Sequence, residues 1–101
     1  MIGICGYGVS LPLFRLSRKE IYETWHMLPF PMRGERTVAN YDEDSLTLAV
    51  AAGIDCLTGF DRKMVDAIFC ASTTFPYHEK LSSAIAAAAL DLREEIRAAD
   101  F

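Results

Sequence analysis

The sequence has no concentration of basic residues and no long apolar run. Its ten Lys and Arg residues are scattered from Arg15 to Arg97 and the net charge is −4, which excludes the basic surface typical of nucleic-acid binding. The longest strictly apolar run, residues 84–90, is far shorter than the roughly 18 residues that a membrane-spanning helix needs. The N-terminus has no basic segment ahead of an apolar one. We therefore expect a soluble cytoplasmic protein with no nucleic-acid partner and no membrane segment.

Cysteine is scarce, and the three cysteines do not form a metal-binding pattern. Cys5, Cys56 and Cys70 each lie among apolar residues, and the sequence has no C-x-x-C motif or Cys-His pairing. An odd number of cysteines in such surroundings is typical of buried, reduced thiols. We expect no metal site, and none of the thiols has a neighbour that would activate it as a nucleophile.

Apolar residues, in contrast, are abundant for so short a chain. They make up 51% of the 101 residues. A body of this size hides only roughly 65% of its unfolded surface. The excess predicts apolar surface that the chain itself does not cover, and therefore a partner or further sequence.

The N-terminal segment predicts a strand followed by a turn. Ile2 and Ile4 would share one face of the strand, and Gly6 and Gly8 permit a sharp turn after it. The order G-x-x-G-x-G with Pro12 behind it is not a dinucleotide-binding fingerprint, because no helix start follows to hold a pyrophosphate. These glycines are therefore interpreted as a turn with close backbone packing.

A clear helix signal comes next. Ser17 and Glu20 form an S-x-x-E capping box, which predicts a helix from Arg18 to about residues 25–27. Residues 28–41 contain two prolines, one glycine and no periodicity, and this composition predicts a loop.

The second half of the chain predicts alternating helices and strands. A helix is expected over residues 44–58, where Gly53 and several alanines would allow another element to approach closely. An unbroken apolar run predicts a strand over 65–71 that is buried on both faces. Small apolar residues all round predict a deeply buried helix over 80–91, and a last strand begins at Ile96. The order β-α-α-β-α-β predicts a layered α/β fold with parallel pairing.

The segment ASTTFPYHEK, residues 71–80, joins the predicted strand to the buried helix. It carries hydroxyls, a histidine and a carboxylate. Ligands of open α/β sheets bind in the crevice at the carboxyl ends of the strands, so this loop is the first candidate for a functional site.

Four stretches together resemble a known family. GICGYGVSLP, ERTVANYDEDSLTLAV, MVDAIFCASTTFPYHEK and IRAADF, in this order and spacing, resemble the N-terminal part of hydroxymethylglutaryl-CoA synthases and related condensing enzymes of the thiolase superfamily. The resemblance extends over essentially the whole chain. It implies a partial thiolase-like layered α/β fold, with residues 1–101 forming the incomplete N-terminal portion of one domain.

The resemblance also implies a reaction. Such enzymes form a thioester on a cysteine and join two acyl groups by carbon-carbon bond formation, with CoA or phosphopantetheine thioesters as substrates and no separate cofactor. The nucleophilic cysteine would lie past Phe101, so we expect this chain alone to be inert. Because the chain stops on an apolar residue within a strand pattern, we expect the cut to fall inside a domain.

Thr73 occupies the position that the resemblance assigns to the general acid/base glutamate of hydroxymethylglutaryl-CoA synthases. A threonine hydroxyl cannot take a carbon-bound proton near neutral pH, because its pKa is far too high. Glu79 is the nearest carboxylate and a weaker alternative, although a carboxylate at a helix start has a simple structural role. His78 has no cysteine or acid partner fixed beside it by the sequence.

Two further interpretations stay open. The Thr73-Thr74 pair resembles the hydroxyl-rich loop of ketoacyl-ACP synthase III-like enzymes, so the chain could be part of such an enzyme, or it could be a non-catalytic thiolase-like partner subunit. By the same resemblance, Arg33 and Arg36 would lie where a CoA or carrier phosphate enters, although solvated surface arginines are the simpler explanation. The expected assembly is a homo-oligomer or a pair with a thiolase-like subunit.

Overall fold

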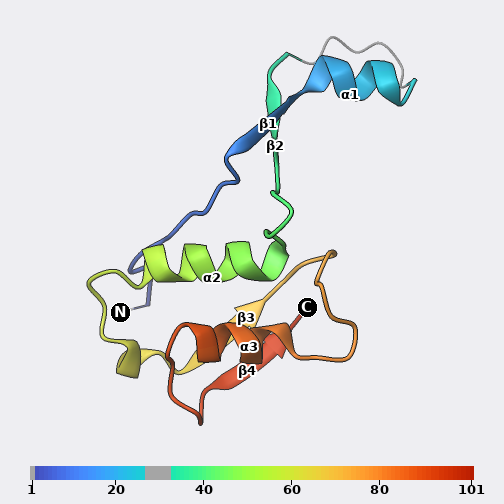
Figure 1. The fold of residues 1–101 in the computed structure, drawn as a ribbon. Coiled ribbons are helices and arrows are strands. Elements are labelled where there is room, and N and C mark those ends of the chain that lie inside the picture. Colours follow the sequence, from blue (N-terminus) through green and yellow to red (C-terminus); the bar gives the residue numbers. More distant parts are fainter. Residues whose placement is uncertain (1, 27–32) are drawn as a thin grey trace. The chain divides into compact units, whose positions relative to one another are not determined.

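The computed structural model describes residues 2–26 and 33–101 of the chain. They form two compact units, one made of the segment up to residue 10 together with residues 44–101, and the other of residues 11–43. The smaller unit has the order β1-α1-β2 and the larger one α2-η1-β3-α3-β4 (Figure 1). Helices and strands alternate and the pair β3-β4 is parallel, which confirms the predicted α/β class. Across the described residues, every helix is too short or too polar to cross a bilayer.

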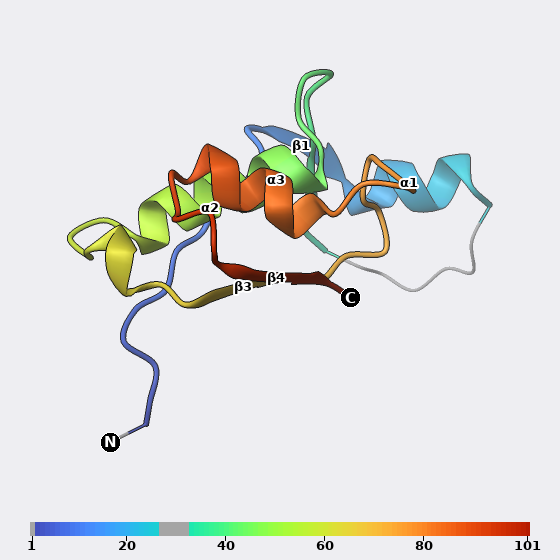
Figure 2. The same ribbon diagram turned by 90° about the horizontal axis from the view of Figure 1, so that it is seen from below.

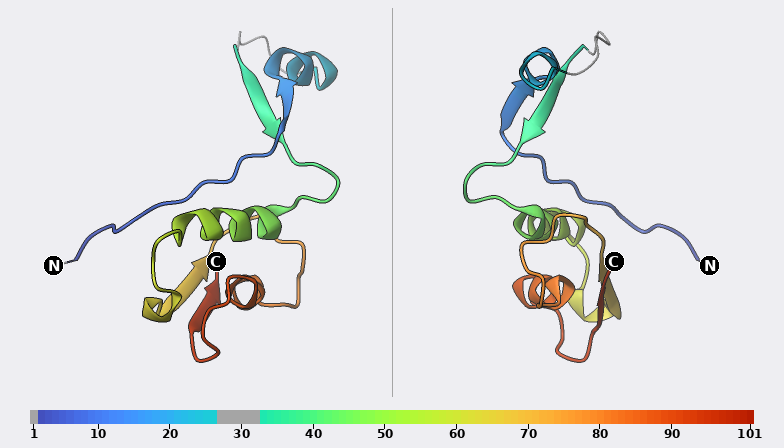
Figure 3. Two further views of the ribbon diagram at one scale, coloured as in Figure 1. Left: turned by 60° about the vertical axis from the view of Figure 1, so that its left-hand side comes forward. Right: turned by 90° about the vertical axis from the view of Figure 1, so that its right-hand side faces the viewer.

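The smaller unit is a two-stranded antiparallel ribbon with one helix. β1 (Phe14–Ser17) pairs with β2 (Glu35–Val38), and Figure 3 shows the two strands side by side. α1 (Arg18–Thr24) begins directly after β1. The backbone N–H of Arg18 donates to the carbonyl of Gly34 over 3.1 Å, so the start of the helix is tied to the residue before β2.

Two predictions for this unit are corrected. The helix begins at Arg18 as predicted, but Ser17 makes no side-chain capping hydrogen bond, because it is also the last residue of β1 and is held opposite Glu35. The predicted loop over 28–41 contains β2, a strand that forms only because β1 offers it a partner edge. Residues 27–32, which include the predicted end of the helix at 27, lie outside the described residues.

The larger unit is a parallel strand pair with two helices on one side. β3 (Ala67–Cys70) and β4 (Arg97–Asp100) are joined through α3 (Ser82–Ala89). α2 (Ser45–Cys56) packs against α3, and the short 3₁₀ helix η1 (Arg62–Met64) leads into β3. Figure 2 shows α2 and α3 on the same side of the β3-β4 pair.

Local chemistry explains where α2 begins and how α3 approaches it. Asp44 and Thr47 form a reciprocal capping box, with each backbone N–H donating to the other residue's side chain over 2.8 Å. A Cβ at Gly53 would lie 2.8 Å from a methyl carbon of Leu90. The helix predicted over 44–58 is thereby confirmed, as is the close approach that Gly53 permits.

The core lies between the two helices and the strands, but it is thinner than predicted. The buried residues of this core are Leu46, Ser82, Ser83, Ala86, Ala87 and Leu90. α3 has more buried residues than the other described helices, yet Ala84, Ala88 and Ala89 are exposed, so the helix is buried on one face and not all round. β3 is likewise not buried on both faces, because Phe69 is 66% exposed, although its ring lies edge to face with that of Phe101. Within the described residues no further layer covers these faces.

The predicted strand at Ile2 and Ile4 is absent. Both side chains are almost fully exposed, and none of the described strands pairs with them. A strand needs a partner edge, and the local pattern cannot supply one. The close backbone packing predicted for the glycines is present at Gly8, where a Cβ would lie 2.2 Å from the carbonyl oxygen of Ala52 in α2.

Candidate functional site

The candidate site lies at the carboxyl ends of β3 and β4. Because β3 and β4 are parallel, their carboxyl ends lie at the same end of the sheet, and the segments that follow them start there. The pairing continues beyond the strands: Phe101 N–H donates to the carbonyl of Cys70 over 2.8 Å, and Ser72 N–H donates to the carbonyl of Phe101 over 3.1 Å. The loop that joins β3 to α3 therefore starts from a fixed position (Figure 1).

Asp100, the last residue of β4, binds the first turn of α3. Its two carboxylate oxygens accept the backbone N–H groups of Ser82 and Ser83, over 2.6 Å and 2.7 Å. Burial alone would raise the pKa of Asp100, but the hydrogen bonds from Ser83 and Ser82 outweigh it and lower the pKa below its ordinary value. The charged carboxylate is thus the form that the fold favours.

Hydrogen bonds made by serine and threonine hydroxyls connect the loop to α2 and hold its first turn. The Ser45 hydroxyl donates to the carbonyl of Thr74 over 2.8 Å. Thr74 N–H donates to the Ser72 Oγ over 3.1 Å, and the Ser72 and Thr74 hydroxyls lie 3.2 Å apart. Neither Ser45 nor Asp100 was predicted from the sequence, since their partners are distant in the chain.

The predicted site residues of this loop are on its surface. Thr73 is exposed, and its side chain makes no hydrogen bond to the described residues. Glu79 and His78 are also exposed, and Glu79 has no ion pair among the described residues. Lys80 lies over the ring of Tyr77, with its Nζ 4.5 Å from the ring centre. The structure places Thr73 and Glu79 on one loop without joining them by a hydrogen bond.

A cavity of about 410 Å³ lies beneath this loop. It is mainly apolar and is lined by α2, β3, α3 and the loop, with contributions from Ser45, Ala49, Ala52, Gly53, Ile68, Phe69, Cys70, Ala71, Ser72, Phe75, Ala86 and Leu90. Burial, and then the neighbouring charge of Asp100, raise the pKa of the Cys70 thiol. The protonated thiol is a poor nucleophile.

The cysteines differ in their surroundings. All three are free, and Cys56 and Cys70 are half-buried. Cys5 is exposed, which corrects the prediction that every thiol is buried. The correction follows from the unpaired N-terminal segment, whose apolar residues around Cys5 have no layer to pack against.

Arg33 and Arg36 belong to the smaller unit. Both are exposed, and Arg36 lies in β2 opposite Leu16. Neither makes an ion pair with the residues that the structure describes. Their position near a phosphate entry stays a prediction.

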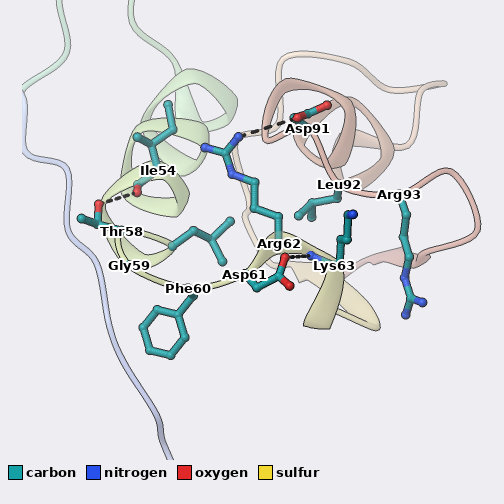
Figure 4. Close-up of a pocket in the computed structure, with 11 residues that line it drawn as sticks. Ile54, Thr58, Gly59, Phe60, Asp61, Arg62, Lys63, Asp91, Leu92 and Arg93 are labelled. Atoms are coloured by element: carbon teal, nitrogen blue, oxygen red, sulfur yellow. Dashed lines mark hydrogen bonds and ion pairs between the residues drawn. The ribbon is translucent and has the colours of Figure 1, made fainter.

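A second, larger pocket of about 690 Å³ lies at the other end of the parallel strands (Figure 4). Its walls come from the end of α2, η1 and the turn after α3, segments that precede β3 and β4. Arg62 pairs with Asp91 over 3.9 Å, and Arg93 pairs with Asp66. Because these cations already face carboxylates of the same unit, the pocket offers little net charge to a ligand.

Comparisons with known proteins place this geometry in context. No family model matches the chain. The hydroxymethylglutaryl-CoA synthase of Pyrococcus horikoshii is 35% identical over 102 residues, which cover 99% of this chain and 29% of that protein. The chain therefore spans less than a third of the length of the curated relative that it matches.

Solved structures have the same fold. The 3-oxoacyl-(acyl carrier protein) synthase III FabH of Pseudomonas aeruginosa is 27% identical with a TM-score of 0.77, over 96% of this chain and 31% of that one. MvaS in complex with 3-hydroxy-3-methylglutaryl coenzyme A is 20% identical with a TM-score of 0.80, over 97% of this chain and 25% of that one. Sequence and fold together identify the chain as a segment related to the hydroxymethylglutaryl-CoA synthases, with the fold of the thiolase-like condensing enzymes.

Proposed function

We propose that this chain is the N-terminal segment of an acyl-CoA condensing enzyme of the hydroxymethylglutaryl-CoA synthase type. The enzyme would join two acyl groups through a thioester on a cysteine outside the segment. The observation that carries the proposal is the match over 99% of the chain to a hydroxymethylglutaryl-CoA synthase at 35% identity. The segment would contribute the wall of the acyl site and not the nucleophile.

The chemistry of the loop supports this division of roles. Cys70 has a raised pKa and lines a cavity beneath the loop, so it is unsuited to form the thioester. Thr73 lies on the surface at the carboxyl end of β3, where ligands of α/β sheets bind. Its hydroxyl can donate and accept hydrogen bonds, but it cannot act as a base near neutral pH. We infer that Thr73 contacts the acyl group and that another residue transfers the proton, with Glu79 the first candidate.

The substrates would be CoA or phosphopantetheine thioesters, with no separate cofactor. Arg33 and Arg36 would bind the phosphate groups of these substrates, and both residues are exposed. The exposed apolar faces of β3 and α3 support an assembly with further polypeptide, either a second copy or a thiolase-like subunit. A cytoplasmic location is part of the same proposal.

The test uses the intact protein that carries this segment. Incubation with acetyl-CoA should give an acetylated enzyme in intact mass spectrometry, and replacement of the nucleophilic cysteine outside the segment should abolish it. Addition of acetoacetyl-CoA or of a malonyl-carrier substrate then separates the hydroxymethylglutaryl-CoA synthase type from the ketoacyl-ACP synthase III type. An intact protein that never acquires an acyl group would contradict the proposal and favour a non-catalytic subunit.

A further inference from the structure

The hydroxyl of Ser45 is free to act outside its own helix. Ser45 is the first residue of α2 and directly follows the N-cap residue Asp44. Here Asp44 and Thr47 already cap α2 reciprocally, over 2.8 Å in each direction. Ser45 instead donates across 29 residues of sequence to the carbonyl of Thr74, also over 2.8 Å.

This hydrogen bond is an isolated anchor. From Thr73 to Lys80, no other hydrogen bond joins the loop to the remainder of the larger unit within the described residues. The contact between Lys80 and Tyr77 is internal to the loop. Phe75 adds an apolar contact, since it is half-buried and lines the cavity beneath.

The backbone groups of both residues next to Thr73 form hydrogen bonds. Ser72 N–H donates to the carbonyl of Phe101. Thr74 N–H donates to the Ser72 hydroxyl, and Thr74 C=O accepts from Ser45. Thr73 is thus bracketed between two fixed peptide groups, although its own side chain is exposed and makes no hydrogen bond to the described residues.

We propose that Ser45 is a positioning residue, whose hydrogen bond to the Thr74 carbonyl sets the place and direction of the side chain at position 73. The proposal rests on the proposed function in one respect, namely that residue 73 borders the acyl site. The positioning itself is a property of the described loop. Because one hydrogen bond is involved, the expected effects are roughly two- to tenfold.

The first experiment measures the loop without catalysis. Ser45→Ala in the intact protein should raise the hydrogen-exchange rates of the Ser72 and Thr74 amides, which are the hydrogen-bonded ones in this part of the loop, by roughly two- to tenfold, with the rates in α2 unchanged. Ser45→Thr keeps the hydroxyl and should restore protection. Thr58→Ala is the matched control, because it removes a hydroxyl bond at the far end of the same helix, from Thr58 Oγ1 to the carbonyl of Ile54. Unchanged exchange in Ser45→Ala would overturn the proposal.

The second experiment is a double-mutant cycle on turnover. Thr73→Glu restores a carboxylate at this position and should raise the rate of condensation of acetyl-CoA with acetoacetyl-CoA. Ser45→Ala should reduce kcat of the Thr73→Glu enzyme by roughly two- to tenfold, and should reduce that of the Thr73 enzyme less, because a carboxylate that transfers a proton depends more on its position than a hydroxyl that only contacts the acyl group. Equal losses in both backgrounds would mean that Ser45 does not act through residue 73, and the proposal would fail.

The two measurements separate the two claims. Faster exchange together with coupled turnover supports both. Faster exchange in an enzyme that shows no condensation with either residue at position 73 supports the positioning and contradicts the proposed function. If the enzyme turns over but Ser45→Ala lowers kcat equally with Thr73 and with Thr73→Glu, or if Ser45→Ala leaves the hydrogen-exchange rates unchanged, the positioning role is contradicted. The proposed function is not affected by either result.

Discussion

The two ends of the β3-β4 pair are held together in different ways. At the carboxyl end, Asp100 accepts two backbone N–H groups of α3, and the strand pairing continues to Phe101. At the amino end, Arg97 N–H donates to the carbonyl of Asp66 over 3.2 Å, but the side-chain contacts are ion pairs: Arg62 and Arg93 pair with Asp91 and Asp66, whose side chains are 93% and 87% exposed. Backbone groups hold fixed positions, whereas exposed ion pairs are screened and flexible. The carboxyl end, where a carboxylate binds two backbone N–H groups of the next helix, is therefore the one suited to hold a loop in a defined place.

The largest effect should come from removing Asp100. Asp100→Ala leaves the backbone N–H groups of Ser82 and Ser83 without their acceptor at the start of α3. We expect the largest fall in melting temperature among the variants discussed, measured by calorimetry on the intact protein. Asp100→Asn keeps one acceptor oxygen, so its melting temperature should fall less. A loss no greater than that of Asp91→Ala, at the amino end, would remove the contrast between the two ends.

Acid should weaken the carboxyl end of the strand pair through Asp100. The pKa of Asp100 is lowered in the folded state, so its contribution to stability is present above the unfolded value of roughly 3.9 and is lost as pH falls through the folded pKa. Chemical denaturation at a series of pH values below about 5 should therefore show a smaller acid dependence for Asp100→Asn than for the wild type. Parallel curves for the two proteins would show that Asp100 is not the titrating group.

The thiol at the carboxyl end should react slowly. Burial, followed by the charge of Asp100, raises the pKa of Cys70, and this favours the protonated form of the thiol. Iodoacetamide at pH 8 should label the exposed Cys5 before Cys70, as read by peptide mass spectrometry. Any stability that the proton on Cys70 provides is present below its unfolded pKa and is lost as pH rises through the folded pKa. Faster labelling of Cys70 than of Cys5 would contradict this assignment.

The smallest effect should come from the amino end. Arg62→Gln removes the ion pair with Asp91, which joins a half-exposed guanidinium to an exposed carboxylate. We expect a loss of about 0–1 kcal/mol in the free energy of unfolding at low salt, and a smaller loss at high salt. Denaturant titrations at two ionic strengths measure it. A larger, salt-independent loss would show that the pocket of Figure 4 is more rigid than its exposed ion pairs suggest.

Local signals in the sequence were enough to place the helices and the parallel strands. The helices predicted over 44–58 and 80–91 and the strand predicted over 65–71 each carry their own pattern, and they are found, somewhat shorter, at Ser45–Cys56, Ser82–Ala89 and Ala67–Cys70. β2 could not be predicted, since its four residues become a strand only through pairing with β1. The missing strand at Ile2 and Ile4 is the opposite case, a strand-like pattern without a partner edge among the described residues.

The candidate site was predicted only in outline. The loop after β3 was identified from its position in the α/β order, and the location of Thr73 and Glu79 on it follows from the sequence alone. Ser45, which anchors the loop, and Asp100, which holds the start of α3, act on partners 29 and 17 to 18 residues away. No local pattern encodes such contacts, because they depend on which segments the fold brings together.

The contact between Gly8 and α2 has a consequence for mutational tolerance. A side chain at position 8 would place its first carbon 2.2 Å from the carbonyl oxygen of Ala52 and 2.3 Å from the backbone nitrogen of Cys56, and neither backbone atom can move aside without unwinding the helix. At Gly3 the same carbon would meet nothing within 4 Å. A saturation library of the N-terminal segment should therefore accept nearly every residue at position 3 and only glycine at position 8. The residues tolerated in this segment are thus limited by the backbone of a helix more than forty residues away in the sequence.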